Sequence, residues 1–208
     1  LTVGGVSYPI SRVQDFPPVA PEGSILSFKN TNNKVLINLS PGVGEYLEQD
    51  ALKYIPFDSE EEQELGEIAA AQRLSGLQQS TGKISYRETK GAVKMFIYRT
   101  DIIDTTVAKQ EDLYKSFSGN VHKILELSDL ASSENRALAY DFMDDIEPNR
   151  KYYYTFRTEN YRGQKSNPGP IYEVELRVQE GFYTPIIQEF IPQITTSKMP
   201  FKQMVRYL

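Results

Sequence analysis

A strict alternation of side chains runs through residues 146–178, which read IEPNRKYYYTFRTENYRGQKSNPGPIYEVELRV. In the first half, Tyr152, Tyr154 and Phe156 fall on one side of an extended chain, and the residues between them fall on the other. A polar segment that contains a glycine, residues 160–167, interrupts the pattern before it resumes. A period of two on both sides of a turn-rich segment predicts a β-hairpin with one buried face. The chain is therefore expected to be built from β-sheets.

The start of this hairpin has a distinctive spacing. Ile146 is followed by one residue and Pro148, and three further residues precede Tyr152, which opens the strand. This spacing resembles the corner between strands E and F of fibronectin type III domains. The resemblance implies that Ile146, Pro148 and Tyr152 form a structural corner, in which the tyrosine ring is buried and its hydroxyl bonds a backbone group. A ligand platform made of Tyr152, Tyr153 and Tyr154 is disfavoured, because only Tyr153 is expected to face outward.

The rest of such a domain can be placed on residues 17–178. The proline-rich segment 17–21 resembles its start, and residues 24–29, 35–39, 93–100 and 137–142 resemble strands A, B, C and E. Leu39 stands where the family usually has a buried tryptophan, and the chain contains no tryptophan. The resemblance implies an all-β fold, a seven-stranded fibronectin type III-like β-sandwich with a partly helical insertion and extended terminal arms.

The insertion, about residues 42–92, lies between the segments that resemble strands B and C. Insertions of this length usually carry structure or contacts. Asp58 or Ser59 can cap a helix whose first turn holds three glutamates, and apolar residues at helical spacing then predict a helix over residues 59–74. The acidic cluster is interpreted as a solvated helix face rather than a metal site, because neighbouring carboxylates on a helix fan outward and no EF-hand spacing is present.

The composition argues against several classes of protein. A formal charge of −5 and a pI near 5.1 disfavour a binder of duplex nucleic acid, which needs a concentrated basic face. The absence of cysteine excludes disulfides, thiolate metal sites and a cysteine nucleophile. The apolar runs are far shorter than the roughly 20 residues that span a bilayer. We therefore expect no nucleic-acid partner and no membrane span.

No residue is predicted to be catalytic. His122, the only histidine, has no nucleophile elbow near it in the sequence. Asp144 and Asp145 are adjacent in an alternating segment and are expected to point to opposite sides, so they do not predict a pair of carboxylates across a cleft. Gly42 and Gly44 lack the lysine of a phosphate loop. We therefore assign no catalytic, metal-binding or cofactor-binding residue, and we infer no small-molecule substrate.

Two apolar arms, residues 1–16 and 179–208, flank the domain. Prolines recur in the second arm, which predicts an extended segment, yet that arm is too apolar to remain in water. It is expected to lie in a groove on its own domain or on a neighbour, the alternative being a linker into a further domain. The candidate partner contacts are Phe182, Tyr183, Ile186, Ile187, Phe190, Ile191, Phe201 and Met204. Because the sequence starts at Leu1, it is also expected to be a processed product or a part of a longer chain.

These features favour a non-enzymatic structural or interaction module of a larger assembly. A virus or phage particle is the favoured setting, and the expected partners are other protein subunits or copies of the same chain, contacted through the arms and the insertion. The alternative is an accessory spacer or carbohydrate-contacting domain of a secreted or surface bacterial protein, which a row of exposed aromatics on one sheet face would favour. A catalytic domain would need a concave pocket lined by converging polar residues.

Overall fold

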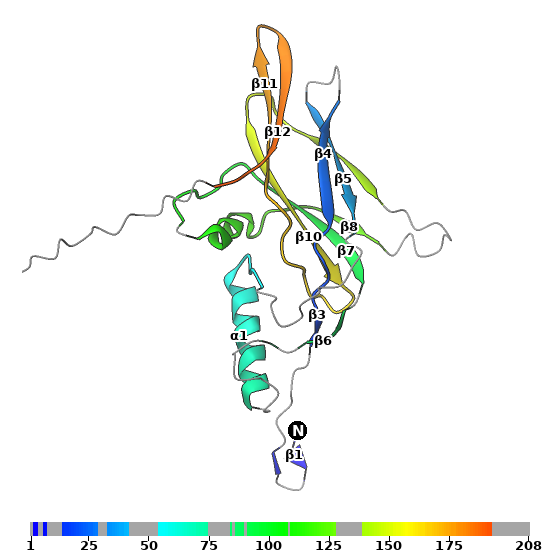
Figure 1. Cartoon of the computed structure of the whole chain (residues 1–208), viewed down its shortest axis with the longest axis vertical. Coiled ribbons are helices and arrows are strands. Elements are labelled where there is room, and N and C mark those ends of the chain that lie inside the picture. The colour runs from blue at the N-terminus through cyan, green and yellow to red at the C-terminus, as the bar shows by residue number, and fades with distance from the viewer. Residues whose placement is uncertain are drawn as a thin grey trace, which may run out of the picture.

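Two antiparallel β-sheets form the body of the molecule (Figure 1). The computed structural model describes residues 2–3, 6–7, 14–28, 33–41, 54–74, 84, 86–89, 91–107, 109–127 and 139–192. The larger sheet has the strand order β12–β11–β10–β7–β8, with β7 at Ala92–Thr100, β8 at Val121–Glu126, β10 at Lys151–Asn160, β11 at Tyr172–Gln179 and β12 at Phe182–Glu189. The smaller sheet has the order β4–β5–β9, with β4 at Glu22–Ser27, β5 at Lys34–Ser40 and β9 at Tyr140–Asp145.

The prediction of an all-β fold is confirmed in this broad form, but the two sheets contain eight strands rather than seven. The additional strand is β12, which lies in the segment that was expected to be an extended arm. Glu180 and Gly181 join it to β11 with positive φ angles of 52° and 84°, as a two-residue type I′ hairpin turn requires. Pro185 is compatible with this strand because β12 is at the edge of the sheet.

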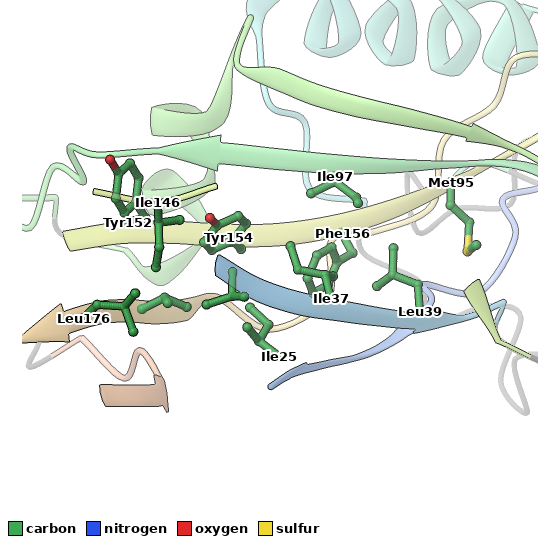
Figure 2. Packing of buried hydrophobic residues seen from close by; sticks show 12 residues of the cluster. Ile25, Ile37, Leu39, Met95, Ile97, Ile146, Tyr152, Tyr154, Phe156 and Leu176 are labelled. Carbon is green, nitrogen blue, oxygen red and sulfur yellow. The ribbon is translucent and has the colours of Figure 1, made fainter. Parts of the chain in front are cut away.

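The main core lies between the two sheets and is built by alternation (Figure 2). Val35, Ile37 and Leu39 of β5 are fully buried, as are Met95 and Ile97 of β7. Tyr152, Tyr154 and Phe156 of β10 point into the same core from the opposing sheet. A period of two in the sequence therefore identifies the inward residues of these strands correctly.

The other face of the larger sheet is buried as well, which contradicts the predicted hairpin with one buried face. Thr155 and Arg157 of β10 have no exposed surface, and Tyr98 of β7 is 3% exposed. Two elements cover this face. One is the 3₁₀ helix η2, Gln110–Phe117, and the other is the segment just before helix α1, which itself spans Ser59–Leu74. In Figure 1, α1 and η2 lie on the side of the larger sheet away from β4 and β5. The second cluster consists of Phe57, Phe96, Tyr98, Leu113, Tyr114, Phe117 and Ile171.

Helix α1 occupies the residues that its sequence predicts. Asp58 is its N-cap, because the Asp58 carboxylate accepts a hydrogen bond of 2.8 Å from the backbone amide of Glu61. Ile68 and Gln72, one turn apart, are the buried residues of the helix, whereas Leu74 is 81% exposed.

The remaining elements are short. Strands β1, Thr2–Val3, and β2, Val6–Ser7, pair with each other, and β3, Gln14–Phe16, pairs in parallel with β6, Tyr86–Thr89. The segment predicted to be strand E, residues 137–142, is shifted: β9 begins at Tyr140 and continues to Asp145. Residues 137 and 138 lie outside the described residues.

Gly23 provides a direct test of the packing between the sheets. A Cβ atom at Gly23 would lie 2.5 Å from a ring carbon of Phe156, which is fully buried. Gly23→Ala is therefore expected to lower the free energy of unfolding by about 1–3 kcal/mol, because the ring has no space in which to move. Gly66→Ala is the control: nothing lies within 4 Å of that Cβ position in α1, so this change is expected to stabilise the fold by about 0.5–1 kcal/mol. Urea denaturation of both variants measures the difference, and equal effects would contradict this packing.

Candidate interaction surface

The hairpin of β11 and β12 carries the largest exposed apolar side chains among the candidate partner contacts. Phe182 and Ile191 are 75% and 76% exposed, and Tyr183 is 45% exposed. Phe182 and Tyr183 follow the hairpin turn, which projects beyond the rest of the sheet in Figure 1. Phe201 and Met204 lie outside the described residues. The hairpin therefore presents apolar surface at its tip and again just after β12.

The other candidate contacts pack, at least in part, on their own domain. Ile186 and Ile187 are half-buried, and Ile187 packs against the main core. The Phe190 ring lies edge-on to Tyr153, with 5.3 Å between ring centroids, and packs against the second cluster. The structure therefore divides the predicted contact set into residues that anchor the arm and the exposed residues Phe182, Tyr183 and Ile191.

The free edge of β12 has a gap in its backbone donors. The Phe190 amide donates to the Ile171 carbonyl at 2.7 Å, and the register of the β11–β12 pair continues this position. Because bonding and non-bonding positions alternate in an antiparallel pair, the even-numbered residues of β12 bond β11 and the odd-numbered residues direct their backbone to the free edge. Pro185 is one of the latter and has no amide proton. The edge is therefore poorly suited to adding another strand, which leaves side chains as its means of contact.

The described part of the insertion is anchored by a buried arginine. Arg157 donates from Nε to the Ser166 carbonyl at 2.7 Å and from Nη1 to both carboxylate oxygens of Glu61 at 3.0 Å. It also donates to the Tyr54 hydroxyl, and its guanidinium lies 4.4 Å from the centroid of the Phe57 ring. Three residues of the insertion thus converge on one residue of β10.

The interpretation of the acidic cluster as a solvated helix face is wrong for Glu61. This carboxylate also accepts hydrogen bonds from Lys165 Nζ and the Phe57 amide, each at 3.0 Å. Burial by itself would raise the pKa of Glu61, but the charge of Arg157 and these bonds outweigh it and hold that pKa below its ordinary value. Burial raises the pKa of Tyr54. Glu61, Arg157 and their hydrogen-bond partners thus attach the insertion to the sheet.

A second polar cluster surrounds Asp144 on β9. Its carboxylate accepts from Arg99 Nη1 at 3.0 Å, from the Tyr154 hydroxyl at 2.7 Å, and lies 2.8 Å from His122 Nε2. Asp144 is 4% exposed, whereas the Asp145 side chain is 72% exposed, so the two carboxylates point to opposite sides as predicted. The sequence did not indicate that His122 would meet Asp144, because the pair forms only when β8 and β9 come together.

This cluster links the two sheets. The contacts of His122 among the described residues are with Asp144 and with the Phe142 ring, 5.8 Å away between centroids. Neither residue is an alcohol or thiol that a histidine–aspartate pair would activate. Asp144 instead joins β9 of the smaller sheet to β7, β8 and β10 of the larger one.

The residues of the expected corner lie at the start of β10. Ile146 and Tyr152 are 3% and 6% exposed, and the Tyr152 hydroxyl accepts a hydrogen bond of 3.3 Å from the Glu147 amide. Pro148 is exposed. The guanidinium of Arg99 lies 5.2 Å from the centroid of the Tyr152 ring. The ring is thus buried, and its hydroxyl bonds the chain a few residues upstream.

Neither a metal site nor a membrane-spanning helix is present within the described ranges. No three histidine, aspartate or glutamate side chains gather there in a way that could hold a metal ion. No helix in that part of the chain is long and apolar enough to cross a membrane. No protein-family model, curated protein or solved structure matches this chain.

Proposed function

We propose that this chain is a non-enzymatic, fibronectin type III-like module that acts as a structural or docking part of a larger assembly, with a virus or phage particle as its setting. The strand order supports the family assignment. The smaller sheet holds the strands that resemble A, B and E, and the larger sheet holds the strand that resembles C together with β10 and β11, the two strands of the predicted hairpin. The buried Tyr152, bonded to the Glu147 amide, supports it further.

The observation that carries the proposed role is the exposure of Phe182, Tyr183 and Ile191. These side chains belong to an arm that is otherwise held to the domain by strand pairing and by Phe190. Large apolar side chains that a rigid element presents to solvent are typical of contact surfaces between proteins. The arm is thus both fixed in position and apolar at its surface, as a docking element requires.

The carbohydrate-contacting alternative has less support. Phe182 and Tyr183 are adjacent in β12, so their rings point to opposite faces of the sheet and do not form a row on one face. The anchored residues of the insertion, Tyr54, Phe57 and Glu61, face their own sheet. The arm is therefore the main contact element of the proposed function.

Sedimentation velocity of the full chain tests this role. The wild-type chain is expected to associate reversibly, and the Phe182→Asp/Ile191→Asp variant is expected to weaken that association by at least about tenfold, because each change places a charge in an apolar contact. Ile102→Asp is the matched control, since Ile102 is 73% exposed but lies outside the arm. A wild-type chain that remains monomeric, or equal weakening by the control, would contradict the proposed role.

A further inference from the structure

The outer face of the smaller sheet carries an apolar row that spans its three strands. Leu26 of β4 pairs with Leu36 of β5, which in turn pairs with Met143 of β9. Directly paired residues point to the same face, and this face is opposite to the one that carries Ile25 and Ile37 into the core. Leu26 and Met143 are 53% and 52% exposed, and Leu36 is half-buried. Three neighbouring apolar side chains thus meet solvent on a rigid surface.

Acidic residues flank this row. Asp141 and Asp145 lie two residues before and after Met143 on β9, and Glu22 lies on the outer face of β4. Lys34 offsets part of this charge, with its Nζ 3.6 Å from the Asp145 carboxylate. These four residues sum to a net charge of −2. The face therefore fits a segment that is both apolar and basic.

Residues 193–208 of this chain have that composition. They contain Lys198, Lys202 and Arg206 and no acidic residue, together with the apolar residues Ile194, Met199, Phe201, Met204, Val205 and Leu208. The formal charge of the whole chain is −5, so subtracting the three positive charges of this segment leaves −8 on residues 1–192. The basic charge of the segment therefore contrasts with the acidic remainder of the chain.

The position at which the arm leaves the domain favours a second copy as the acceptor. Phe190 packs against the second cluster, which lies on the outer face of the larger sheet together with η2. The apolar row lies on the opposite outer face of the molecule, the side of β4 and β5 in Figure 1. To reach its own row, the segment would have to turn around the edge of the sandwich, which uses part of its extended reach of roughly 50 Å before it meets the row. A neighbouring copy can present the same face without that detour.

We propose that residues 193–208 of one copy bind the outer face of the smaller sheet of a second copy. The apolar residues of the segment cover Leu26, Leu36 and Met143, and its lysines and arginine pair with Glu22, Asp141 and Asp145. This inference rests on the proposed function and specifies the surface that receives the arm. Because the donor and acceptor surfaces differ, the contact is heterologous and produces rings or filaments of copies.

A charge exchange between full-length chains tests this contact. The face variant carries Glu22→Lys and Asp141→Lys, and the arm variant carries Lys198→Glu, Lys202→Glu and Arg206→Glu. Each variant is expected to weaken self-association at low salt by at least about tenfold. An equimolar mixture of the two is expected to associate again, as rings or filaments in which the variants alternate. The acidic arm of the arm variant then meets the basic face of the face variant, and the basic arm of the face variant meets the acidic face of the arm variant. The control is Glu62→Lys/Glu64→Lys, which changes the charge by as much as the face variant does, but on the exposed part of α1. This control is expected to associate like the wild type.

The outcomes separate this inference from the proposed function. If the mixture does not associate, or if the face variant associates like the wild type, the arm docks elsewhere and the inference is overturned, while the proposed function stands. A monomeric wild type whose arm cross-links to Met143 of its own chain would overturn the second-copy acceptor. Thermal unfolding of each variant near the wild-type temperature shows that these results do not come from unfolding, since the replaced face residues are exposed.

Discussion

Replacing Arg157 by alanine is expected to lower the free energy of unfolding by about 3–5 kcal/mol, the largest effect of any single polar substitution considered. Arg157 has no exposed surface and meets Glu61, Tyr54 and the Ser166 carbonyl. Its removal leaves a cavity and partly unpaired acceptors beneath the insertion. At about 2–4 °C per kcal/mol for a chain of this size, the melting temperature should fall by roughly 6–20 °C. Thermal and urea unfolding measure both quantities.

A double substitution separates the ion pair from the packing. Arg157→Met with Glu61→Gln removes both charges while keeping most of the volume, so it is expected to destabilise the fold much less than Arg157→Ala. The dependence of stability on pH in the acidic range gives a second measurement. The pKa of Glu61 is lowered in the fold, so its stabilising effect is fully present above its ordinary value of about 4.3 and is lost as the pH falls through the lowered value. The stability difference between wild type and Glu61→Gln should therefore shrink below about pH 4.3, and a constant difference from pH 7 to pH 3 would contradict this pairing.

Asp144→Ala is expected to cost about 2–4 kcal/mol, the second largest effect. The Tyr154 hydroxyl, which is fully buried, loses its acceptor, and His122 loses its carboxylate partner. Arg99 contributes less to this cost because its side chain is 26% exposed and can bond water.

The neighbouring residue provides the matched control for Asp144. Asp145 lies on the same strand, but its side chain is 72% exposed, and its ion pair with Lys34 Nζ, at 3.6 Å, is open to solvent. Asp145→Ala is therefore expected to lower the free energy of unfolding by no more than about 0.5 kcal/mol. Urea denaturation of the two variants should give clearly separated midpoints. Midpoints that coincide would show that Asp144 does not link the two sheets.

Local signals in the sequence predict the interior of the fold well. Alternation places Ile37, Met95 and Phe156 on the core side of their strands, because successive side chains of a strand point to opposite faces of the sheet. The bounds of α1 follow from Asp58 as N-cap and the glutamates of the first turn, all within one short segment. These features depend on neighbours along the chain, so a single sequence is sufficient to find them.

The parts that the sequence does not predict depend on distant contacts. Glu61 and Arg157 are 96 residues apart, and nothing near either residue indicates the other. An arginine among alternating aromatics suggests an exposed side chain until the insertion is known to cover that face. Strand β12 was hidden for another reason: Pro185 argues against a strand in general but is tolerated at a sheet edge where its nitrogen faces outward.

The proposed role depends on the arm being the contact element of an assembly. Hydroxyl-radical footprinting of the full chain, compared between concentrated and dilute solutions, locates that contact directly. We predict that Phe182, Tyr183 and Ile191 are modified several-fold less in the associated state, while Ile102, which is 73% exposed outside the arm, is modified equally in both. Equal modification of the three arm residues in an associated sample would place the contact elsewhere and contradict the proposed role.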